Sequence, residues 1–375
     1  MNRQVLVVAN GRPGAYGTIA AAVARATDGA TITVGPGRYE ENLVLDKRLT
    51  ILAEEGLGTA VVLAQTGSVL TVGGPGAQLR GLELSSADAD LAAIDIHRGQ
   101  LALDGCRVTG ASWATVLARL SGSVAMRDCE VGSSAGAGVV VIGAQASSVE
   151  DTAFRRIAGS AVLVGDVGVL TMRRCELQEP AANAVCVHGQ GTCVVEDCQI
   201  VGAGKPALAT EQGGVLEVRR TTVRDSRNVD LFLRGTGALS IEDSTFTGAA
   251  VQAAHIAEKA APVISRCTFA GAEHVGVHVT DEAAPRLLGC TVEGSPIGVR
   301  VDGSAHATFE AMTVRETSAM IAVVTGTATA GFVGLRASAS AGSGIRAEGG
   351  CRLDLADLRL TVAAAALDVD GDADA

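Results

Sequence analysis

The most constraining feature of this chain is a fixed period of about 23 residues, which lies in the range of known repeat architectures. The period is carried by a series of small side chains at equal spacing: Cys106, Cys129, Thr152, Cys175, Cys198, Thr221, Ser244, Cys267 and Cys290. Leu82 precedes the series at nearly the same spacing, and Met312, Val333 and Ala356 continue it. Such a period is typical of proteins in which each unit packs only on its neighbours. The chain is therefore expected to fold as a solenoid.

The residues inside each repeat indicate which solenoid this is. Short runs of alternating Val, Leu, Ile and Thr are separated by Gly, Asp and Ser, as in SAVLVGDVGVLTMRRCEL at 160–177. Alternation with a period of two indicates strands, and the Gly and Asp positions indicate turns. No repeat contains an amphipathic run long enough for a helix. The sequence thus predicts an all-β fold, a single-stranded right-handed parallel β-helix of about 13 coils stacked about 4.8 Å apart.

Side chains at equivalent positions of successive coils are expected to lie above one another. The series of small side chains then forms an inward column, in which free cysteines pack as small hydrophobic groups. Charges precede it in two further columns: Arg127, Glu150, Arg173, Glu196, Arg219 and Glu242, and Asp128, Asp151, Arg174, Asp197, Arg220, Asp243 and Arg266. Stacked opposite charges favour this register, although each exposed pair contributes at most about 1 kcal/mol.

The first 50 residues differ from the repeat. We expect a strand at 5–9 and then a helix that Thr18 caps and that continues to about Thr27. Such a helix would cover the open end of the coil stack, whose strand edges would otherwise invite pairing. The predicted segments are a cap with opening strands at 1–50, the β-helix at 51–365 and a frayed acidic tail at 366–375.

The stretch PGAYGTIAAAVARATDGATITVGPGRYEENLVL at 13–45 resembles the opening segment of the pectate-lyase-like β-helix superfamily. The coils after it resemble the right-handed β-helix domains of actinobacterial proteins, some of which are joined to an AAA-type ATPase. The resemblance implies the fold, which serves lyases, hydrolases, adhesins and non-catalytic modules alike. The string GAGKPA at 202–207 lacks the spacing of a phosphate-binding loop and has Pro206 at the Ser/Thr position. An ATPase partner would therefore be a separate chain.

Composition excludes several classes of function. A net charge of −11 argues against a nucleic-acid partner, and the alternating signs of the charge columns argue against a mimic of nucleic acid. No apolar stretch is long enough to span a membrane, and the first residues lack a secretory signal. Nine cysteines, mostly in one inward column, suit a reducing cytoplasm. Their spacing is not that of a metal site, so we expect neither a metal nor a cofactor.

One outward row of side chains is apolar over about six coils. It lies between inward residues of the strand centred about 12 residues before each marker, and it comprises Leu117, Val140, Leu163, Cys186 and Phe232. An exposed apolar stripe usually marks an interface, although a turn folded over it would make it part of the core. We expect this stripe to bind a protein partner or a second copy of the chain, and a separate ATPase chain is one such partner.

The same row becomes polar further along the chain. His255, His278 and Arg300 are expected to stack, with Asp281 and Asp302 close by. Histidine and carboxylate groups are the usual acids and bases of catalysis, so these five residues are weak catalytic candidates. Short turns and an aromatic content of 2% argue against a sugar-cleaving site.

Two functions therefore remain open. The first is a non-catalytic scaffold that binds proteins through the apolar stripe. The second is a carbohydrate-active enzyme, of the lyase or hydrolase type, or a sugar-binding protein. Whether the chain is an enzyme stays open at this point.

Overall fold

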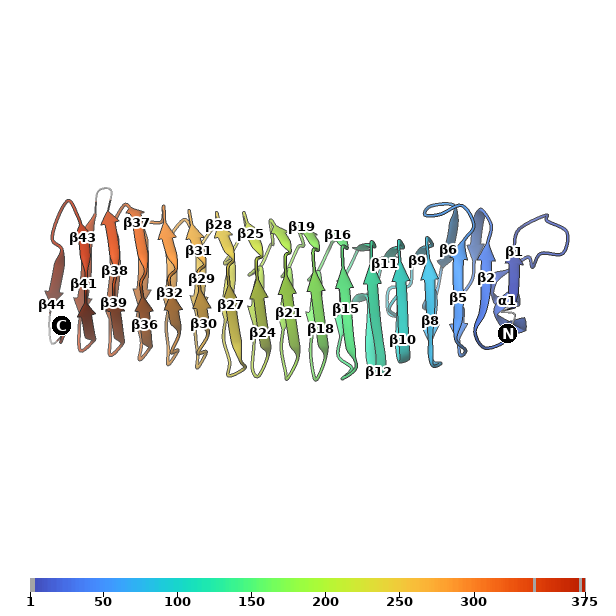
Figure 1. The fold of residues 1–375 in the computed structure, drawn as a ribbon, viewed down its shortest axis with the longest axis horizontal. Coiled ribbons are helices and arrows are strands. Elements are labelled where there is room, and N and C mark those ends of the chain that lie inside the picture. The colour runs from blue at the N-terminus through green and yellow to red at the C-terminus, as the bar shows by residue number, and fades with distance from the viewer. Residues whose placement is uncertain (1–3, 340–341, 371–372, 375) are drawn as a thin grey trace. The chain divides into compact units, whose positions relative to one another are not determined.

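The computed structural model describes residues 4–339, 342–370 and 373–374. The chain divides into two compact units. Unit 1 holds Met1–Ala181 with Gly191–Cys193, and unit 2 holds Ala182–Gln190 with Val194–Ala375. In each unit, strands run side by side in parallel and make two sheets (Figure 1). Each regular coil contributes two strands to the first sheet and one strand to the second sheet.

Unit 1 contains the single described helix, α1 (Ile19–Arg25), and the first strands. Its first sheet contains β1 (Val5–Val8), β2 (Ala30–Val34), β4 (Leu43–Leu45), β5 (Leu49–Ala53), β7 (Leu70–Val72), β8 (Gly76–Arg80), β10 (Ile94–Asp104), β12 (Ala114–Arg127), β14 (Ala137–Val141), β15 (Ala146–Glu150), β17 (Val162–Val164) and β18 (Val169–Arg173). Its second sheet contains β3 (Gly37–Glu40), β6 (Ala60–Ala64), β9 (Glu83–Ser86), β11 (Arg107–Gly110), β13 (Glu130–Ser133), β16 (Ala153–Ile157) and β19 (Glu176–Gln178). The strand β21 (Thr192–Glu196) is divided between the two units.

Unit 2 repeats this plan. Its first sheet contains β20 (Val185–Val187), β23 (Leu208–Thr210), β24 (Val215–Arg219), β26 (Leu231–Leu233), β27 (Leu239–Glu242), β29 (Gln252–Ile256), β30 (Val263–Ser265), β32 (Val275–Val279), β33 (Arg286–Leu288), β35 (Ile297–Val301), β36 (His306–Glu310), β38 (Met320–Thr325), β39 (Thr329–Val333), β41 (Ser343–Glu348), β42 (Arg352–Ala356) and β44 (Leu367–Asp370). Its second sheet contains β22 (Gln199–Val201), β25 (Thr222–Arg224), β28 (Thr245–Thr247), β31 (Thr268–Ala270), β34 (Thr291–Glu293), β37 (Thr313–Thr317), β40 (Arg336–Ala339) and β43 (Arg359–Thr361).

The predicted all-β parallel β-helix is confirmed, and so is its register. Val116 pairs with Val139, and Phe246 pairs with Phe269, each exactly one sequence period further along the chain. The second sheets of the two units hold fifteen described strands, so the prediction of about 13 coils was too low. The additional coils lie near the start of unit 1. The turns there differ in length, so equivalent residues are not regularly spaced by 23 residues and the repeat is difficult to recognise in the sequence. There β3 already pairs with β6 and β6 with β9.

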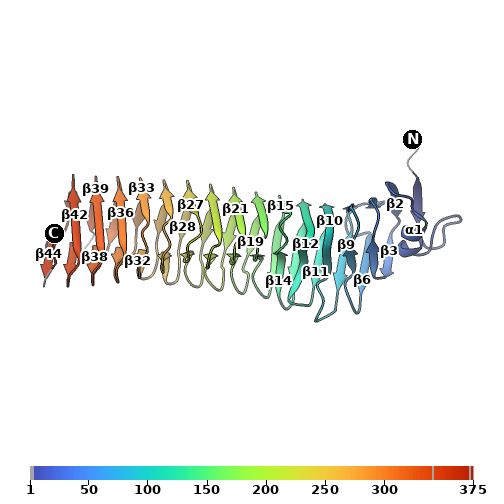
Figure 2. The same ribbon diagram turned by 90° about the horizontal axis from the view of Figure 1, so that it is seen from below.

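The predicted N-terminal helix is confirmed as α1, which Figure 2 shows beside β2. The Thr18 side chain accepts a hydrogen bond from the Ala21 amide, and the Glu41 carboxylate accepts hydrogen bonds from two further amides of the first turn. Lys47 donates to carbonyls at the other end of the helix. Side chains from the first coils therefore satisfy both ends of this short helix. No helix in the described part of the chain is long and apolar enough to cross a membrane.

The opening strands predicted before residue 50 are already part of the coil stack, because β2 pairs along its whole length with β5. The tail is not wholly frayed, because β44 pairs with β41 from the Ile345–Leu367 pair onward. Alternating Leu and Val in LDVD are enough to add one more strand to an existing sheet edge. Residues 371, 372 and 375 of the predicted tail lie outside the described residues.

The inward column is confirmed from Leu82 to Met312. Its predicted continuation is wrong, because Val333 and Ala356 are exposed and the strand register puts Leu335 and Leu358 in the column instead. Cys106, Cys129, Cys175, Cys198, Cys267 and Cys290 are all buried and free of disulfides. Their thiols contact backbone carbonyls, as Cys129 Sγ does at 3.1 Å from the Arg127 oxygen. Burial raises the pKa of Cys129 to about 12, which keeps this thiol protonated at neutral pH. Stacked phenylalanine rings, such as Phe246 and Phe269 at 5.2 Å between centroids, pack elsewhere in the core among Val, Leu, Ile and Ala side chains.

The residue just before each column member makes a sharp turn with positive φ. The turn residues are Gly81, Gly105, Asp128, Asp151, Arg174, Asp197, Arg220, Asp243, Arg266, Gly289, Ala311, Gly334 and Asp357. This conformation is costly for residues other than glycine. Ion pairs between successive turns accompany it, such as Arg174 Nε to Asp151 Oδ1 at 2.7 Å and Arg220 Nε to Asp197 Oδ1 at 2.8 Å. The predicted charge columns are thereby confirmed.

One carboxyl group lies inside unit 2. Asp230 is fully buried, and neither of its carboxylate oxygens has a hydrogen-bond partner among the described residues. Burial raises the pKa of Asp230 to about 8, and the neighbouring Ser226 hydroxyl offsets only part of this effect. Alanines occupy the equivalent places in the adjacent coils, at Ala207 and Ala253. Asp230 therefore stays protonated in the folded chain at pH 7.

We predict that Asp230 makes stability fall as the pH rises. Between pH 3.8 and about 8 the folded state binds the proton that the unfolded state has lost. The contribution of Asp230 to the free energy of unfolding then decreases by about 1.4 kcal/mol per pH unit through this range. The variants Asp230→Asn and Asp230→Ala should lack this slope and exceed the wild type in stability at pH 8. Urea unfolding at a series of pH values tests this, and parallel slopes for wild type and both variants would contradict it.

Candidate functional site

The outward row that was predicted to become polar lies on the outward face of the first sheet in unit 2. We call its residues Phe232, His255, His278 and Arg300 the polar row. The register places Phe232 beside His255, His255 beside His278, and His278 beside Arg300. Their strand neighbours Leu231 and Leu233 point inward and are fully buried. The predicted stacking of His255, His278 and Arg300 is therefore correct. Successive side chains of a strand point to opposite faces of the sheet, so a residue between two inward residues points outward.

Three rings of this row are in contact. The centroids of His255 and His278 lie 4.8 Å apart, with the ring planes inclined by only 16°. Phe232 lies 5.0 Å from His255 in a tilted arrangement, and the Arg234 guanidinium lies 5.6 Å from the centre of the Phe232 ring. These contacts join aromatic and cationic groups into one continuous strip.

His278 is held at both ring nitrogens. Its Nδ1 lies 2.8 Å from the Gln252 amide nitrogen, and its Nε2 lies 3.0 Å from Asp302 Oδ2. Since the amide nitrogen can only donate, Nδ1 accepts and Nε2 carries the proton that it donates to Asp302. Arg300 Nε donates to the same carboxylate oxygen at 2.8 Å.

The pKa of Asp302 reflects these contacts. Burial raises it, but hydrogen bonds from Thr280, His278 and Arg300 together outweigh burial and bring the pKa below its ordinary value. Asp302 is therefore an acceptor at neutral pH and is not a proton donor. Asp281 does not join this group by a hydrogen bond within the described residues. Its carboxylate instead accepts from the Glu258 amide in a turn.

His255 is the one ring in the row with a free nitrogen. Its Nε2 is buried and has no hydrogen-bond partner among the described residues. Burial and the adjacent His278 lower the pKa of His255 to about 4, so the ring is neutral at pH 7. A neutral imidazole of this kind can accept a proton or a hydrogen bond. Among the described residues no group of His, Cys, Asp or Glu is arranged to hold a metal ion.

We call His255, His278, Arg300 and Asp302, with the groups that contact them, the polar cluster. The sequence analysis missed three of its members: Gln252, Thr280 and Arg234. Gln252 and Thr280 lie at the ends of the paired strands rather than in the outward row itself. The pairing of Gln252 with Val275 would have indicated Gln252, because it brings the amide next to the strand that carries His278.

The predicted apolar stripe is only partly exposed. Leu117 and Val140 are just 7% and 4% exposed, so the prediction of an exposed stripe is wrong at these two positions. They form a cluster with Ala92, Ala114 and Ala137, against which Ile142 and Leu163 pack. The apolar side chains of this cluster cover Leu117 and Val140, whereas Val44 in the same outward row is 61% exposed. Leu163, and in unit 2 Cys186 and Phe232, are half-buried.

Exposed apolar side chains border this cluster in unit 1. Leu91 is 55% exposed and Trp113 is 51% exposed, and each directly precedes an alanine of the cluster. Both stand three residues before paired positions, Ile94 and Val116, so they occupy equivalent places in adjacent coils. We call Leu91, Trp113, Ile142 and Leu163 the apolar patch. The sequence analysis missed Leu91 and Trp113 because they lie in turns, outside the strand alternation.

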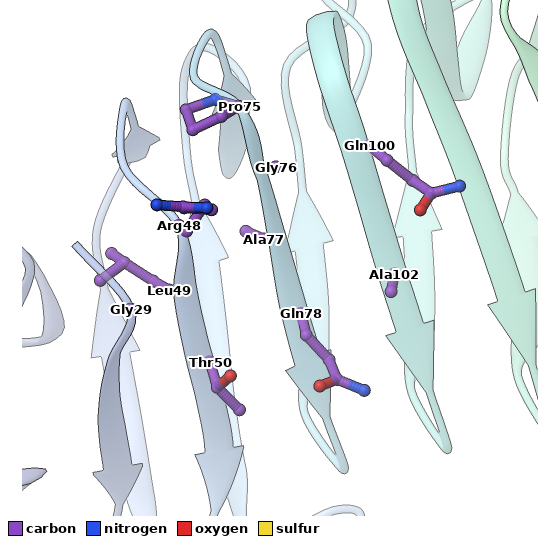
Figure 3. Close-up of a pocket in the computed structure, with 10 residues that line it drawn as sticks. All are labelled: Gly29, Arg48, Leu49, Thr50, Pro75, Gly76, Ala77, Gln78, Gln100 and Ala102. Carbon is purple, nitrogen blue, oxygen red and sulfur yellow. The ribbon is translucent and has the colours of Figure 1, made fainter. Parts of the chain in front are cut away.

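A shallow groove of about 400 Å³ lies elsewhere on unit 1 (Figure 3). Gln78 and Gln100 come from β8 and β10 and present amide groups, and Thr50 on β5 adds a hydroxyl. Arg48 also lines the groove, but its guanidinium is engaged by Asp28 at 2.8 Å. Such a lining suits a neutral polar ligand better than a charged one.

Comparison with known proteins agrees with this fold. The family model described as "Right handed beta helix region" matches residues 58–200 and 160–318, more than half of the chain. The chain belongs to this right-handed β-helix family. No curated protein sequence matches it.

Solved structures of similar fold include carbohydrate-active enzymes. The catalytic unit of a GH87 alpha-1,3-glucanase from Streptomyces thermodiastaticus has a TM-score of 0.52 at 13% identity, over 92% of this β-helix chain and 65% of the glucanase chain. A GH87 alpha-1,3-glucanase catalytic domain in complex with nigerose has a TM-score of 0.53 at 10% identity, over 96% and 67%. A pectin methylesterase from Aspergillus niger has a TM-score of 0.47 at 14% identity, over 59% and 86%. At these identities the likeness to the two glucanase structures shows the fold alone.

We predict that His255 destabilises the β-helix under acidic conditions. Between about pH 4 and 6.5 the unfolded state binds a proton at His255 that the folded state does not, so the contribution of His255 to the free energy of unfolding falls as the pH is lowered. The variant His255→Phe should weaken this dependence, whereas the exposed His306→Phe should keep it. NMR titration of the His255 ring should give a midpoint near 4. A midpoint near 6.5, or equal slopes for both variants, would contradict this.

Proposed function

We propose that this chain is a non-catalytic β-helix scaffold that binds a protein partner through the apolar patch of unit 1. The observation that carries the proposal is the position of Trp113, the only tryptophan of the chain. It is half exposed, at the position equivalent to Leu91 in the adjacent coil, and it directly precedes Ala114 of the buried apolar cluster. Exposed apolar groups gathered on a rigid face are typical of interfaces, and tryptophan often dominates the binding energy there.

The polar cluster of unit 2 supports this non-catalytic reading. His278 has both nitrogens engaged, and Asp302 is held as an acceptor by His278 and Arg300. A general base needs a free nitrogen directed at its substrate. A closed network of this kind serves instead to hold adjacent strands in register.

The partner is either a second copy of the chain or a different protein, such as a separate ATPase chain. Sedimentation velocity over a range of concentrations tests the first case. Capture from native lysate, followed by identification of the bound protein, tests the second. Both measurements use the whole chain.

We expect Trp113→Asp and Leu163→Asp to weaken the association at least tenfold, because each places a charge in an apolar contact. The control is Val44→Asp, at a 61% exposed position of unit 1 outside the patch. It should bind like the wild type. Circular dichroism first establishes that all variants fold equally. A wild type that stays monomeric and captures no partner, or equal association by all variants, would overturn the proposal.

A carbohydrate-active or sugar-binding role is the second candidate. The free Nε2 of His255, within the ring stack from Phe232 to His278, favours it. The GH87 enzymes of similar fold are alpha-1,3-glucanases, which suggests alpha-1,3-glucans as first ligands to test. The resemblance of residues 13–45 to the pectate-lyase-like superfamily suggests polyuronates as the next. Binding or cleavage that is lost in Phe232→Ala and His255→Ala, and kept in Trp113→Asp, would replace the scaffold proposal with this one.

A further inference from the structure

Two arginines are stacked on the outward face of the second sheet in unit 2. The register pairs Thr313 with Arg336, and Arg336 with Arg359, on β37, β40 and β43. Strands paired in this way lie about 4.8 Å apart. Like charges directly opposite each other on adjacent strands repel and destabilise the sheet.

Other arginines of this chain avoid such a neighbour. In unit 1, Arg107 lies between Glu83 and Glu130 and is within 3.5 Å of both carboxylates. On β37 itself, Arg315 forms an ion pair with Glu293 of the preceding coil. By contrast, neither Arg336 nor Arg359 has a carboxylate within 4.0 Å among the described residues. This pair is therefore an exception to the charge pattern that otherwise stabilises the coils.

The two arginines also line a hollow of about 380 Å³. Its other lining residues are Ala311, Thr313, Gly334 and Asp357. Ala311, Gly334 and Asp357 are the positive-φ turns of three successive coils, and two of them lack a long side chain. The hollow is thus bounded by the arginines, by the Thr313 hydroxyl and by turns that leave space. Asp357 contributes one negative charge, which offsets part of the positive potential.

We propose that this hollow binds a phosphate group, either as the free ion or as a monoester. A guanidinium presents a planar fork of donors that matches the oxygens of phosphate. Two such forks and a hydroxyl can engage three oxygens. A charge near −2 offsets the repulsion between Arg336 and Arg359, which a single carboxylate would offset only in part.

The test is the melting temperature of the whole chain as inorganic phosphate replaces chloride at constant ionic strength. A ligand that binds only the folded state raises this temperature, and the rise grows with the logarithm of the ligand concentration once that concentration exceeds the Kd. We expect a rise for the wild type, and its loss in Arg336→Gln and in Arg359→Gln. Asp357→Asn should bind phosphate more tightly, because it removes the opposing charge. This variant should also fold normally, since asparagine tolerates the positive φ of this turn.

Arg227→Gln is the matched control, since Arg227 is another exposed arginine of unit 2 with no carboxylate within 4.0 Å among the described residues. It should respond to phosphate like the wild type. A second measurement needs no ligand. At low ionic strength without phosphate, Arg336→Gln should melt at a higher temperature than the wild type, because it removes the repulsion.

Glucose 1-phosphate, tested beside inorganic phosphate, distinguishes the two sources. Tighter binding of the sugar phosphate would assign the site to an esterified group, and equal or weaker binding would assign it to the free ion. The proposal is overturned if neither probe raises the melting temperature of the wild type. It is also overturned if Arg336→Gln and Arg359→Gln keep the full response.

Discussion

The structure depends on the register between successive coils. Backbone hydrogen bonds between parallel strands do not choose one register, because a slip by a few residues would form as many bonds. The choice comes from side chains that recur once in every period: the buried column that includes Cys129 and Cys175, and the positive-φ turn just before each of its members. A slip of one residue would expose the column and bury the charges. The ion pairs between turns, such as Asp151 with Arg174, act in the same direction.

The same register determines what each unit presents to solvent. Each outward side chain lies beside the equivalent side chains of the preceding and the following coil. A change of residue in one repeat therefore changes the contacts with these two neighbours. A run of apolar outward residues becomes the cluster around Leu117 and Val140, and a run of aromatic and histidine residues becomes the stack from Phe232 to His278. Two arginines in successive repeats become a pair of repelling charges at Arg336 and Arg359. The surface chemistry of this fold therefore follows columns of equivalent residues, and a candidate site lies where the type of side chain in a column changes.

Much of this could be predicted from the sequence. The period predicted the fold, the buried column and the charge pairs, and strand alternation predicted that His255, His278 and Arg300 share one face. The exposure of the apolar stripe was predicted wrongly, because alternation indicates the direction of a side chain and does not indicate what covers it. Trp113 and Gln252 were missed for a related reason. They lie in turns or at strand ends, where a period of two no longer describes direction, and only the paired strands show which groups they meet.

What the sequence determined by itself is everything that follows from periodicity. These features are the parallel β-helix, the inward and outward sides of each strand and the neighbours along each column. The tertiary structure alone decided how closely those columns pack and which polar groups meet across them. It buried Leu117 and left Trp113 exposed, it engaged both nitrogens of His278 and left one nitrogen of His255 free, and it enclosed Asp230 without a partner. The physical reason is that burial and hydrogen bonding depend on distances between side chains in different coils, and a one-dimensional pattern gives their order without those distances.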